Sequence, residues 1–288
     1  MNKNKIKEGF LINLADKKNV YLLGLIWADG FLYDKKYKRV SLELKANDFN
    51  DIEPILTSNG INCIYVRKRL NSSHLQKSMS FNDIKIFNFL KNNDYHIKSG
   101  TSPDKILKEI PENLKYYWWR GYFDGDGCLY IKTKNQLAFW STITQDWSFL
   151  KNLFHSLDIC YYTTIKYSRK NTTHLSSSVE IRKMGEIKLM LEYIYKNYDG
   201  IGISRKYSRY LEFLDKYLKS KVFKKTSSYK YICFNNNNKK WGSFWKGKYL
   251  GWFDSELEAI NKQEKYIKDN NIIKENEIKT QEIDLICK

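Results

Sequence analysis

The chain has 288 residues, a net charge of +18 and an aromatic content of 16%. Such a large excess of positive charge favours a polyanionic partner, either nucleic acid or an anionic membrane surface. The longest apolar run, residues 21–28, is far too short to cross a bilayer. We therefore expect nucleic acid as the partner and no membrane.

Cysteine usage and the N-terminus bear on the compartment. The five cysteines are scattered and form no CxxC pair, which argues against a zinc ribbon or a disulfide framework. The N-terminus alternates lysine and asparagine and lacks the apolar stretch of a signal peptide. We expect an intracellular, reducing location, either an organelle matrix or the cytoplasm of a bacterium or a phage-infected cell.

Two similar segments, residues 22–30 and 119–127, stand out along the chain. Each is an apolar, helix-like run that ends in an Asp-Gly step, at Asp29-Gly30 and Asp126-Gly127. The final aspartates lie 97 positions apart, about one small domain. A repeated segment of this kind suggests a two-fold arrangement with the two carboxylates close together. Paired carboxylates are the usual way to hold a hard cation such as Mg²⁺.

The repeat extends beyond the two motifs. Each motif helix is followed by two strand patterns, a helix opened by an Asp-aromatic pair, a second pair of strands and a third helix, which gives helix-strand-strand-helix-strand-strand-helix twice. We predict a first half over residues 1–97, an extended connector over 98–115 that contains Pro103 and Pro111, and a second half over 116–220. The second half closes with a basic helix over residues 204–219.

A break in composition marks a third module near residue 227. Residues 221–253 contain eight lysines and no acid, whereas the segment from residue 254 onward is rich in acids. Strands are predicted at 229–234, 240–245 and 249–253, and a helix at 256–269 begins with a capping-box pair, Ser255 and Glu258. The module is thus predicted over residues 227–269, and 270–288 form a mobile or weakly helical tail.

The two motifs, their spacing and the repeated element order resemble the LAGLIDADG homing endonuclease family in its single-chain, two-motif form. The resemblance covers roughly residues 18–220. It implies an α+β fold of two pseudo-symmetric αββαββα halves packed through their motif helices, with a small C-terminal βββα module attached. Small residues would allow the helices to approach closely, at Gly24, Ala28, Gly121 and Gly125.

The same resemblance implies the catalytic centre. The acids at the eighth motif position, Asp29 and Asp126, would bind the divalent metal, Mg²⁺ with Mn²⁺ as a substitute. Gly30 and Gly127 are counted with them as metal-site residues, at helix exits with unusual dihedral angles. The sixth position differs between the motifs: we interpret Trp27 as a packing residue and do not count Asp124 as catalytic.

The resemblance also implies a basic residue near each acid, just after the third helix of each half. The matching positions are Lys98 and Lys206, with Arg205 as an alternative to Lys206. A positive charge there would add electrostatic stabilisation to phosphodiester hydrolysis. The expected products are a 5′-phosphate and a 3′-hydroxyl.

The strands should form two sheets whose polar faces contact the DNA major groove. Strand alternation assigns polar side chains to those faces, where they can read base edges or contact phosphates. The candidates are Arg39, Lys45, Arg67, Arg69, Gln76, Gln136, Lys166 and Ser168.

The C-terminal module resembles an AP2 DNA-binding domain, carried by residues 229–232, Lys240-Trp241 and the run 247–255. The resemblance implies a three-stranded sheet in the major groove. The implied DNA contacts are Lys230, Trp241, Lys246 and Lys248.

The chain is thus predicted to be a monomeric, site-specific double-strand DNA endonuclease with a long, non-palindromic target. The main alternative is a nucleic-acid-binding protein that does not cleave, such as an intron maturase or a transcription regulator on the same scaffold. The four histidines lie far apart, so no His-Asn-His nuclease motif is visible. A structural or membrane-surface protein would leave the paired acids unexplained.

Overall fold

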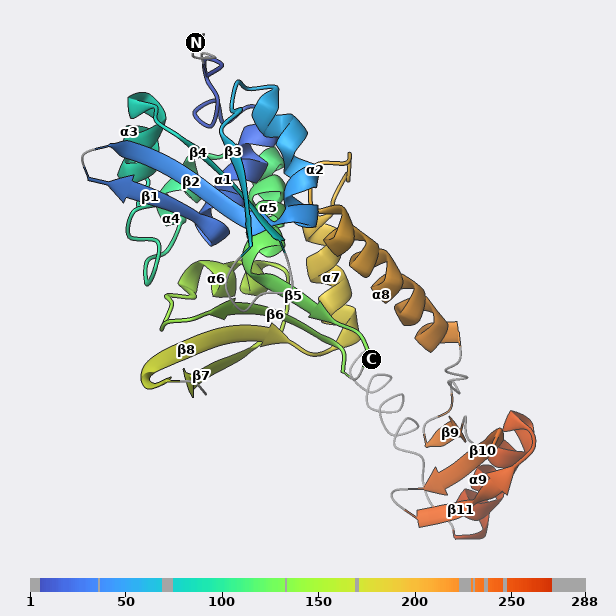
Figure 1. Ribbon diagram of the computed structural model, residues 1–288. Helices are drawn as coiled ribbons and strands as arrows, with labels where there is room; N and C mark the ends of the chain where they lie inside the picture. The colour runs from blue at the N-terminus through green and yellow to red at the C-terminus, as the bar shows by residue number, and fades with distance from the viewer. Residues whose placement is uncertain are drawn as a thin grey trace, which may run out of the picture. The chain divides into compact units, whose positions relative to one another are not determined.

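The computed structural model describes residues 6–35, 37–68, 75–132, 134–168, 171–222, 229, 231–235, 238–245 and 248–270. The chain divides into two compact units, residues 1–214 and 215–288 (Figure 1). Within the described residues, no helix is both long enough and apolar enough to cross a membrane.

The first half of the larger unit follows the predicted element order. Its four strands pair antiparallel in the order β1-β2-β4-β3. The elements are α1 (Lys17–Asp29), β1 (Gly30–Asp34), β2 (Lys38–Lys45), α2 (Ala46–Thr57), β3 (Ile64–Lys68), β4 (Leu75–Phe81) and α3 (Ile84–Asn92).

The second half repeats this order, and its sheet has the matching strand order β5-β6-β8-β7. The α+β class and the two αββαββα halves are therefore confirmed. The elements are α5 (Lys115–Asp126), β5 (Gly127–Tyr130), β6 (Gln136–Ser141), α6 (Ser148–Ser156), β7 (Tyr162–Ser168), β8 (Asn171–Ile181), α7 (Met184–Ile194) and then α8 (Ser204–Val222).

The prolines predicted an extended connector between the halves, and this prediction is wrong. The connector contains the short helix α4 (Asp104–Glu109) and a 3₁₀ turn, η1 (Glu112–Leu114). Pro103 and Pro111 are the residues immediately before these two turns. Proline is tolerated at the start of a helix, where its missing N–H would have no helical partner anyway. The prolines therefore mark helix starts rather than an extended strand.

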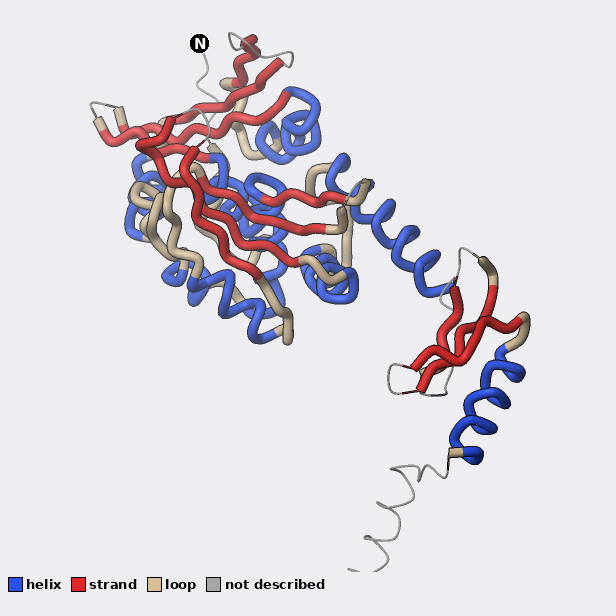
Figure 2. The backbone as a smooth tube through the Cα atoms, turned by 90° about the horizontal axis from the view of Figure 1, so that it is seen from below, coloured by secondary structure: helices blue, strands red, loops and turns tan. Residues whose placement is uncertain are grey.

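The two motif helices, α1 and α5, pack against each other at the centre of the unit (Figure 1), whose strands lie beside its helices (Figure 2). A Cβ atom at Gly24 would lie 1.9 Å from the carbonyl oxygen of Trp118, and one at Gly121 would lie 2.0 Å from that of Tyr21. A Cβ at Gly125 would lie 2.2 Å from that of Ala28. Only glycine fits at Gly24 and Gly121 because backbone meets backbone there, and at Gly125 because the side chain of Ala28 lies against it, as the small residues of both motifs predicted.

The smaller unit is a three-stranded antiparallel sheet with one helix. Its elements are β9 (Ile232–Asn235), β10 (Lys240–Trp245), β11 (Lys248–Phe253) and α9 (Glu256–Asp269). The predicted capping box is formed in full between Ser255 and Glu258 at the start of α9. Ile232, Trp241, Ala259 and Ile260 form the core between the sheet and this helix. The predicted tail, apart from Asn270, lies outside the described residues.

Candidate functional site

Asp29 and Asp126 are the last residues of α1 and α5, and each is followed by a glycine that ends the helix. The N–H groups of Gly30 and Gly127 donate to the carbonyl oxygens of Ile26 and Phe123. Both glycines have ordinary extended backbone angles, with φ of −77° at Gly30 and −79° at Gly127. The expectation of unusual dihedral angles is therefore wrong.

Close approach explains these two glycines instead. A Cβ at Gly30 would lie 2.5 Å from the carbonyl oxygen of Ile26, and one at Gly127 would lie 2.1 Å from the Phe123 ring. The chain turns back tightly over the last helical turn at both positions. That tight exit directs each preceding aspartate toward the end of the helix pair.

Both aspartates line one cavity of about 290 Å³ at the ends of α1 and α5. The lining also includes Lys98, Tyr122 and Gln145. A Cβ at Gly125 of α5 would lie 3.1 Å from Oδ2 of Asp29, so the carboxylate of the first half lies against the helix of the second. The two halves thus contribute one aspartate each to the same cavity.

The charges in this cavity act on one another. Partial burial, and then the negative charge of Asp29, raise the pKa of Asp126 to about 7, while Lys98 and Lys206 oppose the change. Burial lowers the pKa of Lys98 to about 8, against the pull of Asp126 and Asp29. The two carboxylates and the ammonium group therefore interact electrostatically within one cavity.

The predicted lysines occupy matching places in the two halves. Nζ of Lys98 donates to the carbonyl oxygens of Ile26 and Ala28, at 3.2 and 2.6 Å. Nζ of Lys206 donates to those of Phe123 and Gly127, both at 2.7 Å. Each lysine therefore covers the C-terminal end of its own motif helix, where a positive charge is favoured by the helix dipole.

The two lysines differ in the space that they face. Lys98 lines the cavity with both aspartates, whereas Lys206 lines a neighbouring cavity of about 470 Å³ together with Arg209. Burial lowers the pKa of Lys206. The alternative residue, Arg205, makes a two-point ion pair with Asp48 of α2, at 2.9 and 2.8 Å. Its guanidinium group is thus held by another element.

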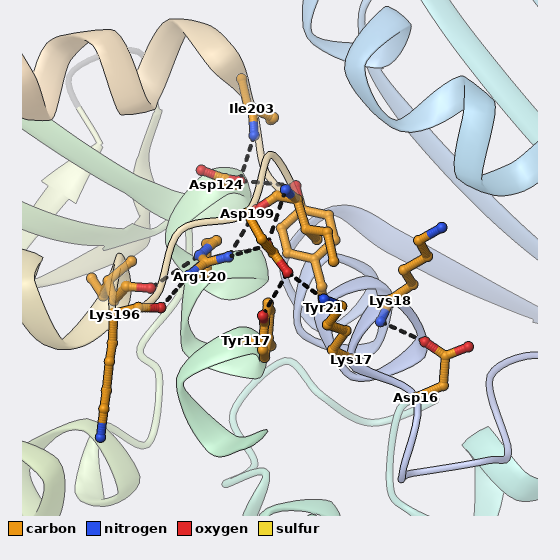
Figure 3. Close-up of polar contacts among 12 residues, drawn as sticks. Asp16, Lys17, Lys18, Tyr21, Tyr117, Arg120, Asp124, Lys196, Asp199 and Ile203 are labelled. Atoms are coloured by element: carbon orange, nitrogen blue, oxygen red, sulfur yellow. Dashed lines mark hydrogen bonds and ion pairs between the residues drawn. The ribbon is translucent and has the colours of Figure 1, made fainter. Parts of the chain in front are cut away.

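The sixth motif positions are both buried and have different roles. Trp27 packs edge-on against Tyr95, with ring centroids 4.9 Å apart, which agrees with a packing role. Asp124 accepts hydrogen bonds at 2.8 Å from the hydroxyl of Tyr21 and from the N–H of Ile203, both on Oδ2 (Figure 3). Burial raises the pKa of Asp124 to about 6.

A buried arginine completes this part of the second half. Arg120 has no exposed surface, and its guanidinium group donates to the carbonyl oxygens of Ile194, Lys196 and Ile201 (Figure 3). These bonds fix the segment between α7 and α8. Sequence reasoning missed this role, although an arginine inside an apolar motif helix is a signal of a buried polar network.

The candidate DNA-contact residues of the first sheet share one exposed face. The strand register aligns Arg39 with Tyr33, Lys45 with Gln76, and Gln76 with Arg67. Arg67 also forms an ion pair with Glu43 on the same face. Two aromatic residues on this face, Phe31 and Tyr33, were not predicted. They share the face of Arg39 because β1 pairs Tyr33 with Arg39, and Phe31 is two residues from Tyr33. Arg69 lies outside the described residues.

The second sheet corrects the prediction for Gln136. Its side chain is only 2% exposed, and the residues that share its face near the sheet centre, Ala138, Ser178 and Glu180, are also buried. Strand alternation predicts the face but not what covers it. Lys166 is exposed, as predicted. The side chain of Ser168 lies outside what the structure describes.

Of the predicted DNA contacts in the C-terminal module that the structure describes, one is buried and one is exposed. Trp241 is buried in the core of the smaller unit, so it does not lie on an exposed face. Its side chain fills the space under α9, a role that a tryptophan in a short strand commonly takes. Lys248 is exposed, and its ammonium group lies 4.8 Å from the centre of the Tyr266 ring. Lys230 and Lys246 lie outside the described residues.

The donor set of the central cavity fits Mg²⁺. Within the described part of the chain, no cluster of three or more His, Cys, Asp or Glu side chains could hold a metal. Mg²⁺ is commonly bound by one or two carboxylates and completes its shell with waters and substrate phosphate oxygens. Asp29 and Asp126 supply that number of carboxylates, and the cavity leaves room for the remaining ligands.

Comparison with known proteins gives structural neighbours alone. No family model matches the chain, and no curated protein matches it. The solved structures that resemble it include the meganuclease I-SmaMI bound to DNA, 13% identical over 70% of this chain and 90% of that one, with a TM-score of 0.45.

Two further neighbours have similar scores. The LAGLIDADG meganuclease I-CpaMI bound to DNA is 14% identical over 70% of this chain and 92% of that one, with a TM-score of 0.44. The N-terminal LAGLIDADG domain of WhiA is 18% identical over 67% of this chain and 90% of that one, with a TM-score of 0.42. Similarity of this extent carries no functional inference, so the function depends on the geometry of the site.

Proposed function

We propose that the chain is a metal-dependent, site-specific double-strand DNA endonuclease of the LAGLIDADG type. The observation that carries the proposal is the meeting of Asp29 and Asp126, from opposite halves, in one cavity with Lys98. The net charge of +18 and the exposed polar face of the first sheet support DNA as the substrate.

The chain's own residues would divide the work of hydrolysis. Asp29 and Asp126 would hold Mg²⁺, and the chemistry supplied there would be activation of a water and neutralisation of charge on the scissile phosphate. The carboxylates would provide its protein ligands, one from each half. The ammonium group of Lys98 would hold positive charge beside the reacting phosphate. The products would be a 5′-phosphate and a 3′-hydroxyl.

The two unlike halves suit a long, non-palindromic target read by a single chain acting as a monomer. The sheet faces would supply base and phosphate contacts, and the lysine-rich C-terminal unit, with its AP2-like sequence, would add affinity for DNA. The alternative is a protein that binds nucleic acid on this scaffold without cleaving it, such as an intron maturase or a transcription regulator.

Cleavage of a library of AT-rich duplexes in the presence of Mg²⁺, with Mn²⁺ as a second metal, tests the proposal. We expect defined double-strand products from the wild type and none from Asp29→Asn or Asp126→Asn. Asp158→Asn is the matched control, because Asp158 is exposed and its left-handed backbone, φ 54°, suits asparagine equally well. If the two motif variants cut as well as the control, the endonuclease proposal fails.

Binding without cleavage would favour the alternative. In that outcome the wild type retains the duplex in a gel-shift measurement, loses it steeply as salt is raised, and yields no product with either metal.

A further inference from the structure

The smaller unit contains a bulge that changes which side chains share a face of its sheet. Strands β10 and β11 pair Gly242 with Trp252 and then Phe244 with Tyr249, so one extra residue, Leu250, lies in β11. In a regular strand, residues 249 and 252 would point to opposite faces. The bulge brings Tyr249 onto the face of Trp252, which is a recognised use of such irregularities.

Three aromatic rings meet on this face. The ring of Phe244 lies 5.4 Å from that of Tyr249 and 6.1 Å from that of Trp252, and the last two are 6.0 Å apart. A Cβ at Gly242 would lie 2.5 Å from the Trp252 ring and 2.8 Å from the Phe244 ring, so these rings lie directly over the glycine backbone. We call Phe244, Tyr249 and Trp252 the aromatic platform.

The aromatic platform is not part of the core under α9. The core side chain Trp241 and its neighbour Phe253 point to the helix side, whereas Gly242 and the rings over it belong to the opposite face by strand alternation. Tyr249 is 51% exposed and Trp252 is 37% exposed. Phe244 is partly buried beneath them, and two exposed rings side by side on one face of a small unit mark a binding surface rather than a packing need.

Charge indicates what binds there. Residues 221–253 carry eight lysines and no acid, and the chain has no arginine after Arg209. The positive charge suits a nucleic-acid backbone, whereas for base edges in a duplex groove the unit offers lysine and no arginine. Exposed rings in a positively charged setting are the usual means of binding unpaired bases, which stack on them. A duplex keeps its base faces inside its own stack.

We propose that the aromatic platform binds single-stranded DNA by base stacking. This goes beyond the proposed endonuclease activity and depends on it only for the choice of DNA over RNA. A strand locally unpaired beside the target would be held by the smaller unit while the larger unit holds the duplex. Because both units belong to one chain, the second contact would form at a raised effective concentration.

The test uses the full chain and labelled oligothymidylate, with oligouridylate as the RNA arm. At about 0.3 M salt, where backbone attraction is weakened, we expect Trp252→Ala and Tyr249→Ala each to lose about fivefold or more in affinity. Trp252→Phe should retain most of it, because phenylalanine still offers a ring. Leu257→Ala is the matched control, since Leu257 is an exposed apolar residue of α9.

A second measurement needs no substitution in the sheet. Photo-crosslinking of iodouracil-containing DNA to the wild type should attach to Phe244, Tyr249 or Trp252. Unchanged affinity in both alanine variants, or crosslinks confined to residues 1–214, would overturn the proposal, as would tighter binding of the RNA arm. Duplex cleavage is a separate readout of the proposed endonuclease activity. If the wild type cuts no duplex, the single-strand binding result still stands.

Discussion

The hydroxyl of Tyr21 in α1 donates a 2.8 Å hydrogen bond to the buried carboxylate of Asp124 in α5. The same carboxylate oxygen accepts the N–H of Ile203, directly before α8, so a single acceptor joins both motif helices and the start of a third helix. The bond crosses the interface between the halves and has no counterpart at the equivalent position, Trp27. It is therefore a source of asymmetry in a repeated fold.

Removing this hydroxyl should cost stability. Tyr21→Phe leaves a buried carboxylate with one donor fewer, so we expect a loss of about 1–3 kcal/mol in the free energy of unfolding. Tyr65→Phe removes the same group from an exposed ring and should change stability by less than about 0.5 kcal/mol. Chemical denaturation of both variants makes the comparison, and equal stabilities would mean that the interface bond contributes nothing.

The helix pair should not tolerate alanine at its crossing point. At Gly24 and Gly121 a Cβ would overlap carbonyl oxygens of the partner helix, and neither backbone can move without separating α1 from α5. We expect Gly24→Ala and Gly121→Ala each to cost about 3 kcal/mol or more.

An alanine control comes from another helix of the same unit. Gly185, in α7, has open space around the position of a Cβ, so Gly185→Ala should cost nothing. Thermal unfolding followed by circular dichroism measures all three variants. A similar melting temperature for Gly24→Ala and Gly185→Ala would contradict the close helix contact.

Lys98 and Lys206 should not contribute equally to the proposed cleavage. Lys98 shares a cavity with both aspartates, whereas Lys206 faces a separate cavity, so Lys98→Met should slow cleavage by about 10²–10³-fold and more than Lys206→Met does. Duplex affinity in the absence of divalent metal should stay near that of the wild type.

Plasmid cleavage separates the two lysine effects. Linear plasmid shows that both strands are cut, nicked plasmid shows that one cut is lost, and supercoiled plasmid shows that both are lost. Lys105→Met is the control, since Lys105 is an exposed lysine that pairs with Asp94 away from the cavity. Equal rate losses in the Lys98 and Lys206 variants would contradict the asymmetry.

Local and repeated patterns explain how much was predictable from the sequence. The spacing of Asp29 and Asp126 predicted one composite site, because a repeated helix that ends in an acid brings the acids together at a two-fold axis. The capping pair, Ser255 and Glu258, was readable because both residues act within one helical turn.

Long-range packing was not readable in the same way. Nothing near Asp124 in the sequence indicates that Tyr21 is its partner, since 103 positions separate them. The burial of Gln136 and Trp241 depends on what covers a strand face, which alternation does not encode. The helix within the connector was missed because its prolines precede the turns rather than interrupt them.

The burial of Gln136 gives a direct test of how the second sheet is used. Its side-chain oxygen is buried without a hydrogen-bond partner, so Gln136→Leu should leave stability unchanged or raise it by about 1 kcal/mol, and should leave duplex affinity unchanged. Arg67→Ala removes an exposed cation from the first sheet. It should weaken duplex binding and reduce the slope of log affinity against log salt by about one. Fluorescence anisotropy over a salt series measures both variants. If Gln136→Leu lowers duplex affinity without changing stability, Gln136 contacts DNA and the correction based on its burial is wrong.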